Sequence, residues 1–122
     1  MLSIIRDTKK LDQVLVALAN EKRRGIVYAL GLQPASIGQL AKQQRSSLPS
    51  MHRHVKVLEK AKLVQRKKSG RVNFLALDRT GLLLVQDWIR QYHAYWGTNK
   101  ETLENYIAGI ERSNKKLKKL NK

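Results

Sequence analysis

The strongest constraint on the fold is a run of local signals between residues 36 and 77, in the order helix, turn, helix and hairpin. Ser36 and Gln39 form a capping box, because Ser36 caps a short helix and Gln39 can reach back to the Ser36 N–H. After a tight turn, Ser47 caps a longer helix. Pro49 is tolerated in the first turn of that helix, which has no intrahelical N–H bonds to lose.

The longer helix has one apolar face and one polar, positive face. Met51, Val55 and Leu58 are spaced four and three residues apart, so we expect them to point inward. The opposite face carries Pro49, Ser50, His52, Arg53 and Lys56. A major groove about 12 Å wide admits a helix, and its base edges favour Arg on guanine and Ser on either base type. The pattern therefore predicts a helix that reads double-stranded DNA.

A basic hairpin follows this helix. Residues 63–67 and 72–77 are predicted strands, and Gly70 supplies the positive φ that the tight turn between them needs. Its tip and flanks carry four cations, Arg66, Lys67, Lys68 and Arg71. A helix in the major groove with a hairpin on the neighbouring backbone is the winged helix-turn-helix arrangement. We therefore predict a mostly α fold with a small β-hairpin wing.

The charge of the chain agrees with a polyanionic partner. Residues 22–71 contain thirteen Lys and Arg against one acid, Glu59, and the 122-residue chain has a net charge of +16. No apolar run approaches the ~20 residues of a spanning helix, and the start lacks the apolar stretch of a secretory signal. The absence of cysteine excludes disulfides and thiolate metal sites. We expect a cytoplasmic protein without a membrane partner.

The flanking segments are helical and predict a homodimer. Helices are expected over about 7–19 and, capped by Asn20, over the residues that follow. From about 78 to 118 a three-four alternation of apolar residues forms a heptad seam, which one small core cannot cover. The predicted interface comprises Leu11, Val85, Ile89, Tyr92, Trp96, Leu103, Tyr106 and Ile110. Gly97-Thr98-Asn99 is a weak place where this helix could kink.

The predicted organisation is thus one domain over residues 1–122. Helices and wing occupy about 7–77, a dimerisation helix about 78–118, and a basic tail 119–122.

Several segments, taken in order, resemble the ArsR family of bacterial and archaeal repressors. They are LANEKR at 18–23, SIGQLA at 36–41, HVKVL at 54–58, Leu63-Val64, Gly70-Arg71 in the wing and the aromatic-rich segment 88–96. The resemblance covers roughly residues 8–110. It implies a homodimeric winged-helix repressor in which residues 47–53 read the bases.

This sequence departs from the family where metals are sensed. Members that sense metal through thiolates carry cysteines beside the recognition helix, and here there are none. Members with zinc on the final helix use a carboxylate and several histidines, whereas here His93 stands alone, with Glu104 eleven residues later. We expect no metal, no cofactor and no metal sensing. Whether a small-molecule effector exists is left open.

The predicted mechanism assigns base reading to Ser50 and Arg53, and phosphate contacts to Ser47, His52, Lys56 and the wing cations. His54 is expected to make a structural hydrogen bond near the helix–wing junction. Two alternatives also accommodate the charge, a non-specific nucleoid protein and an RNA-associated winged helix. An enzyme is not expected, because no phosphate loop or paired carboxylates are present.

Overall fold

The computed structural model describes residues 2–92 and 99–120, with side-chain surroundings from residue 8 onward. The chain divides into two compact units, Met1–Arg90 and Gln91–Lys122. The buried core lies in the first unit, whereas α6 (Asn99–Leu120) in the second buries no residue. Each unit is therefore described separately.

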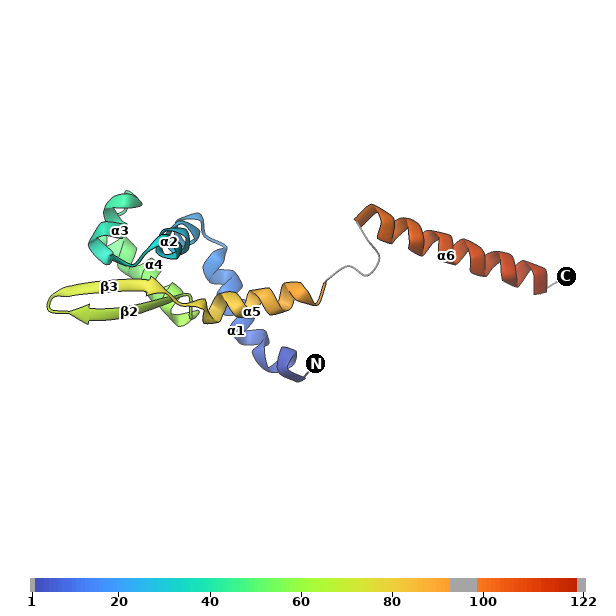
Figure 1. Cartoon of the computed structure of the whole chain (residues 1–122), viewed down its shortest axis with the longest axis horizontal. Helices are drawn as coiled ribbons and strands as arrows, with labels where there is room; N and C mark the ends of the chain where they lie inside the picture. The colour runs from blue at the N-terminus through green and yellow to red at the C-terminus, as the bar shows by residue number, and fades with distance from the viewer. Residues whose placement is uncertain (1, 93–98, 121–122) are drawn as a thin grey trace. The chain divides into compact units, whose positions relative to one another are not determined.

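The first unit combines helices with a three-stranded antiparallel sheet of strand order β1-β3-β2 (Figure 1). Its elements are α1 (Leu2–Leu18), α2 (Glu21–Leu32), β1 (Ala35–Ser36), α3 (Ile37–Gln43), α4 (Leu48–Lys60), β2 (Val64–Ser69), β3 (Val72–Leu77) and α5 (Arg79–Arg90). This is the predicted winged helix-turn-helix, with α3 and α4 as the two helices and β2–β3 as the wing.

Strand β1 was not predicted. Ala35 pairs with Leu75 and Ser36 with Phe74, so this short strand joins the wing through β3. Two residues are too few to produce the alternating pattern by which a strand is found in a sequence.

The predicted caps are confirmed by hydrogen bonds. The Asn20 side chain caps α2. The Gln39 N–H donates to Ser36 Oγ at 3.2 Å, while the Ser36 N–H donates to Gln39 Oε1 at 2.9 Å, which completes the capping box. At α4 the Ser50 N–H donates to Ser47 Oγ at 3.3 Å. These bonds satisfy N–H groups that have no partner within their helices. The boundaries of the two central helices therefore follow from short-range signals.

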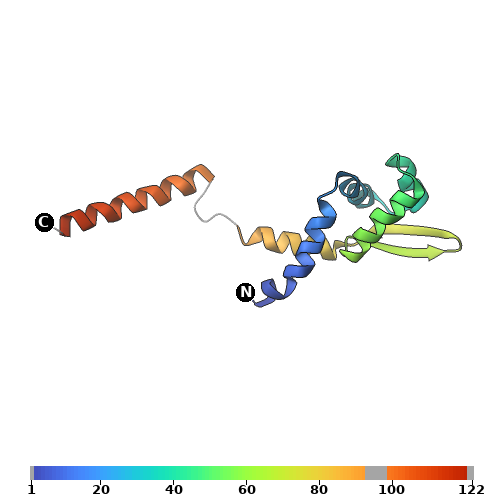
Figure 2. The ribbon, with the colours of Figure 1, turned by 180° about the vertical axis from the view of Figure 1, so that it is seen from behind.

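The core lies where the helices meet the sheet. Met51, Val55 and Leu58 of α4 are fully buried, as their spacing predicted. They pack with buried residues of the other elements of this unit, namely Val14, Ala17, Ile26, Leu30, Ile37, Leu40, Ala41, Ala61, Leu63, Val64 and Leu75. Helices α1 and α5 lie side by side in both views (Figures 1 and 2). One face of α4 is therefore packed against the core, while the opposite face points to solvent.

Gly81 lets α5 approach the segment between α4 and β2 closely. Its N–H donates to the Lys62 carbonyl oxygen at 2.8 Å. A Cβ atom at this position would lie 2.6 Å from the Ala61 carbonyl oxygen and 2.9 Å from that of Lys62. Because both contacts are backbone atoms, no side-chain rotation can relieve them. The start of α5 is therefore fixed against the end of α4.

The wing is a regular hairpin with a two-residue turn. β2 and β3 pair from Val64 with Leu77 to Ser69 with Val72. Gly70 has φ 61°, which confirms the positive φ predicted for the turn. Glycine at this first central position is the requirement of a type II′ turn.

The long C-terminal helix expected over about 78–118 is divided. α5 ends at Arg90, Gln91 and Tyr92 lie in a turn, and α6 begins at Asn99. Of the weak place predicted at residues 97–99, only Asn99 is described, as the first residue of α6. The predicted interface residue Trp96 likewise lies outside the described residues.

The division also separates the predicted heptad seam. Val85 is half-buried and packs against the core of its own unit, while Ile89 and Tyr92 are exposed. Leu103, Tyr106 and Ile110 lie exposed on α6. The described members of the predicted seam thus lie on α5, in the turn after it and on α6, and their role as a dimer interface stays a prediction. In the described part of the chain no helix is both long and apolar enough to cross a membrane.

Candidate DNA-binding interface

The polar face of α4 is available to a partner. Arg53 and Lys56 are exposed, whereas Ser50 and His52 are half-buried beside them. Ser47 and Pro49 are exposed at the N-terminal end of the helix. Because Met51 and Val55 are fully buried between these positions, α4 cannot rotate without exposing its apolar face. The side chains predicted to contact DNA therefore share one outward face of a fixed helix.

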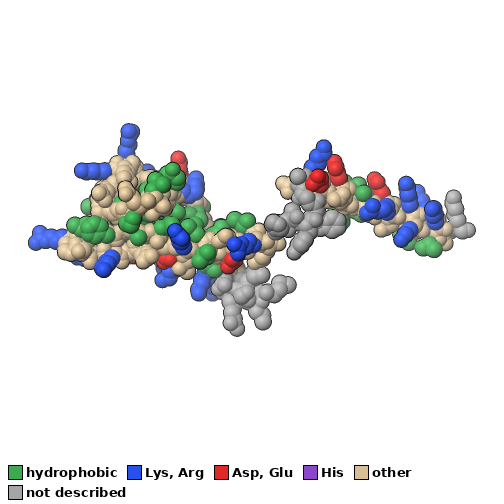
Figure 3. Space-filling view, in the orientation of Figure 1, with side chains coloured by type: hydrophobic (Ala, Val, Ile, Leu, Met, Phe, Trp, Pro, Cys, Tyr) green, Lys and Arg blue, Asp and Glu red, His purple; other side chains and the backbone are tan. Residues whose placement is uncertain are grey.

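Three of the four predicted wing cations are exposed, Lys67, Lys68 and Arg71. Lys67 is opposite Phe74 in the ladder and Lys68 is opposite Asn73. Since successive strand residues point to opposite faces, the two lysines project from different sides of the wing. Figure 3 shows Lys and Arg side chains projecting from the far end of the hairpin. The wing tip thus carries positive charge on both sides.

Arg66 is placed differently from the other wing cations. Its Nη2 and Nε both donate to Glu59 Oε1, at 2.6 and 3.0 Å, and the two side chains are about one quarter and one third exposed. This ion pair joins the wing to the last part of α4. The sequence predicted that Arg66 contacts phosphate, but in this structure its guanidinium has a partner within the chain. The pair holds the wing against the recognition helix.

Comparison with known proteins agrees with this geometry. The helix-turn-helix domain family matches residues 18–66. HTH-type transcriptional regulator Rv2034 of Mycobacterium tuberculosis is 35% identical over 89 residues, which cover 69% of this chain and 83% of that protein. The crystal structure of an ArsR family transcriptional regulator superposes with a TM-score of 0.66 at 29% identity, covering 70% of this chain and 88% of the other.

The chain belongs to the ArsR family of winged helix-turn-helix transcriptional regulators. Its fold is also that of the homodimeric winged helix-turn-helix domain Mb0332 from Mycobacterium bovis. That solution structure matches with a TM-score of 0.58 at 19% identity, over 72% of this chain and 88% of the other. This ArsR-type regulator is thus a DNA-binding protein, and the exposed face of α4 is the candidate recognition surface.

The recognition helix of this regulator is braced by α2 through Arg23. Arg23 Nη1 lies 3.4 Å from His54 Nδ1. The same guanidinium donates to two carbonyl oxygens at the end of α1, from Nε to Ala17 at 2.7 Å and from Nη2 to Val16 at 3.2 Å. Because an arginine can only donate, Nδ1 of a neutral His54 is the acceptor. One side chain therefore links α1, α2 and α4.

The sequence predicted a structural hydrogen bond for His54, and this is confirmed, but its location was wrong. The bond joins α4 to α2 rather than to the wing. Arg23 was missed as an organising residue. Arg24 also bonds to the end of α1, since its Nη1 donates to the Leu18 carbonyl oxygen at 2.9 Å. The last carbonyl groups of a helix have no donors within that helix, and arginine side chains can supply them. The adjacent pair Arg23 and Arg24, soon after the predicted first helix, was a signal of this role.

The surroundings of His54 make the stability of this ArsR-type regulator depend on pH. Burial lowers the pKa of His54 below its usual value, and the charges of Arg23, Lys22 and Arg53 lower this pKa further. Between that usual value, about 6.5, and the lower folded-state pKa, the unfolded chain binds more protons. The free energy of unfolding therefore falls as pH falls through this window.

We expect His54→Gln to reduce this dependence, because glutamine can still accept from Arg23 but does not titrate. The measurement is urea unfolding of both proteins at intervals from pH 7.5 to pH 5, with the other two histidines unchanged. An identical pH slope in the variant would show that His54 does not supply this contribution.

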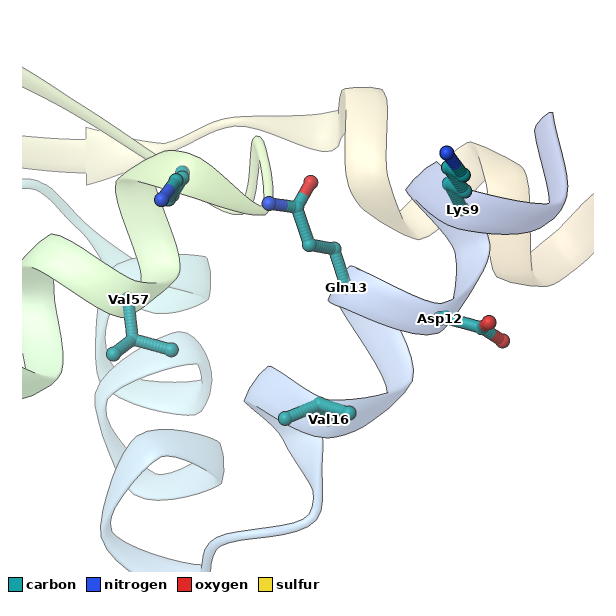
Figure 4. Close-up of a pocket in the computed structure, with 6 residues that line it drawn as sticks. Lys9, Asp12, Gln13, Val16 and Val57 are labelled. Carbon is teal, nitrogen blue, oxygen red and sulfur yellow. The ribbon is translucent and has the colours of Figure 1, made fainter. Parts of the chain in front are cut away.

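A surface groove of about 370 Å³ lies between α1 and the C-terminal half of α4 (Figure 4). It is lined by Lys9, Asp12, Gln13, Val16, Val57 and Lys60. It contains none of the residues predicted to bind DNA. Over residues 2–92 and 99–120 no three His, Asp or Glu side chains come together as a metal site.

Proposed function

We propose that this ArsR-type protein is a homodimeric repressor that recognises a specific duplex sequence without sensing metal. In this proposal Ser50 and Arg53 read base edges in the major groove. The observation that supports it best is the position of Arg53, exposed on α4 between buried Met51 and Val55. A bidentate arginine–guanine contact is the commonest specific contact of this kind.

The phosphate contacts are assigned to residues around that face. Ser47, His52 and Lys56 flank the base-reading side chains on α4, and Lys67, Lys68 and Arg71 extend from the wing. Such contacts fix the register of the protein on the duplex but carry no sequence information. Arg66 is left out of this set because Glu59 already occupies its guanidinium.

The homodimer is supported by apolar side chains at the surface of the first unit, Met1–Arg90, and just after it. Ile89 is exposed near the end of α5, Tyr92 is exposed in the turn that follows, and Leu11 is half-buried on α1, which contacts α5. Val85 contributes less than the sequence suggested, because it packs inside its own unit. Two-fold symmetry then requires a roughly palindromic site with half-sites about 34–36 Å apart.

Replacing Arg53 with alanine tests the base-reading role. We expect Arg53→Ala to reduce discrimination at one base-pair position by about 1–3 kcal/mol, because the guanidinium no longer pairs with that base. The measurement is selection of bound duplexes from a random pool, followed by titration of single-position variants of the selected site. Arg79→Ala removes the same charge from the start of α5 and should leave the base preference unchanged.

The two alternative functions give different results in the same experiment. A nucleoid protein would select no sequence, and Arg53→Ala would weaken its binding to every duplex equally. An RNA-associated protein would prefer an A-form duplex or single strands. Either result would replace the repressor proposal.

A further inference from the structure

Helix α6 presents an apolar stripe that the described residues of its own unit leave uncovered. The large apolar residues of the stripe are between 45% and 80% exposed, and they are Leu103, Tyr106, Ile107, Ile110, Leu117 and Leu120. No residue of this helix is buried within the described chain. In water a helix of this kind is stabilised chiefly by packing its apolar face against a partner. A partner for this stripe is therefore expected.

The spacing of the stripe matches a coiled coil. Leu103, Tyr106, Ile110, Ser113, Leu117 and Leu120 alternate three and four residues apart, which are the a and d positions of a heptad. Ser113 and Asn114 interrupt the apolar surface at its centre. A lipid surface would leave these polar groups against acyl chains, whereas a coiled coil tolerates a polar a or d residue and uses it to set the register.

The charges of α6 are distributed unevenly along its axis. The first turns carry Glu101 and Glu104 together with one cation, Lys100, whose Nζ lies 4.0 Å from Glu104 Oε1, while Lys115, Lys116, Lys118 and Lys119 lie in the last turns. Figure 3 shows most of the basic side chains of this helix toward its end, with acidic side chains and a basic one at its start. A parallel pair of such helices would place both sets of lysines together. An antiparallel pair separates the two sets of lysines and places each beside the end of the other helix that carries Glu101 and Glu104.

We infer that α6 pairs antiparallel with α6 of a second copy of this chain. One register brings every a and d position opposite another. In it Leu103 faces the partner's Leu120, Tyr106 faces the partner's Leu117, and Ile110 faces the partner's Ser113. This inference names a further contact within the proposed homodimer. It rests on that proposal only because it also requires two copies of the chain to associate. It adds a contact outside the DNA-binding unit.

Cysteine cross-linking of the full-length protein tests the orientation. The chain has no cysteine, so single-cysteine variants have no background reaction. The two variants are Tyr106→Cys and Leu117→Cys, one carrying an affinity tag so that the mixed product is resolved on a gel. We expect the mixture to form the mixed disulfide at least about tenfold faster than either variant forms its own, because pairing raises the local thiol concentration. Lys115→Cys, on the outer face, is the matched control.

Each other outcome overturns the inference. Efficient self-cross-linking of Tyr106→Cys alone would show a parallel pair. Rates no higher than those of Lys115→Cys would show that α6 does not pair. Protection of the Tyr106→Cys thiol from alkylation only by phosphatidylserine vesicles would assign the stripe to a membrane surface. The effect of Arg53→Ala on base discrimination, measured separately, would survive all three results, so the proposed function can stand without this inference.

Discussion

Raising the salt concentration from 50 to 200 mM should weaken binding of the regulator to its DNA site by about 10³–10⁵-fold, if the dimer neutralises about 6–10 phosphates. Each neutralised phosphate releases condensed counterions, and this release becomes less favourable as salt increases. The exposed cations of α4 and the wing, among them Lys56, Lys67, Lys68 and Arg71, make this the largest effect expected. Fluorescence anisotropy with a labelled duplex at several salt concentrations measures it.

The wing can be tested by the slope of the same titration. Replacing Lys68 and Arg71 with glutamine should reduce the slope of log affinity against log salt by about one for each phosphate that the variant no longer neutralises. Lys62→Gln, an exposed cation after α4, is the control. A slope unchanged by the wing double variant would remove the wing from the interface. A slope near zero in the parent protein would show that its cations do not neutralise phosphates, and would contradict the predicted salt dependence.

Gly81→Ala should destabilise the DNA-binding unit by about 3 kcal/mol, at the upper end for an overpacked site. The added Cβ would meet two backbone carbonyl oxygens, at 2.6 and 2.9 Å, so α5 must move away from the end of α4. For a unit of this size that destabilisation corresponds to a fall in melting temperature of roughly 12–24 °C. Thermal unfolding followed by circular dichroism measures it.

Gly38→Ala provides the matched control for this substitution. Gly38 lies in α3, and a Cβ there meets no atom within 4 Å. Alanine is favoured over glycine in a helix by about 1 kcal/mol, so this variant should be slightly more stable than the parent. Equal effects of the two substitutions would contradict the close approach at Gly81.

The elements that the sequence predicted well are those set by neighbouring residues. The capping box at Ser36, the Ser47 cap and the inward face of Met51, Val55 and Leu58 all depend on spacings of three or four residues. The positive φ of Gly70 likewise follows from the hairpin turn itself. Local signals of this kind placed the helices and the wing, and with them the outward face of α4.

The features that the sequence did not reveal depend on contacts between separate helices and strands. Strand β1 exists because Ala35 and Ser36 meet β3 some forty residues later. Glu59 and Arg66 pair across the bend between α4 and the wing, and Arg23 reaches His54 across thirty-one positions. Spacing along a chain does not specify which charges on different elements become neighbours. For this reason the sequence could not distinguish Arg66 from the other wing cations.

The unequal support of the wing has a mechanical consequence. β1 pairs with β3 only at Phe74 and Leu75, so the sheet is three strands wide only in the middle of the wing, and the two residue pairs nearest the turn form a two-stranded ribbon. Two strands alone are marginally stable, so this tip is held less firmly than the three-stranded part. We expect the tip with Lys68 and Arg71 to adjust to a wider or narrower groove without displacing α4. In the proposed complex the same helix would then bind duplexes of different groove width.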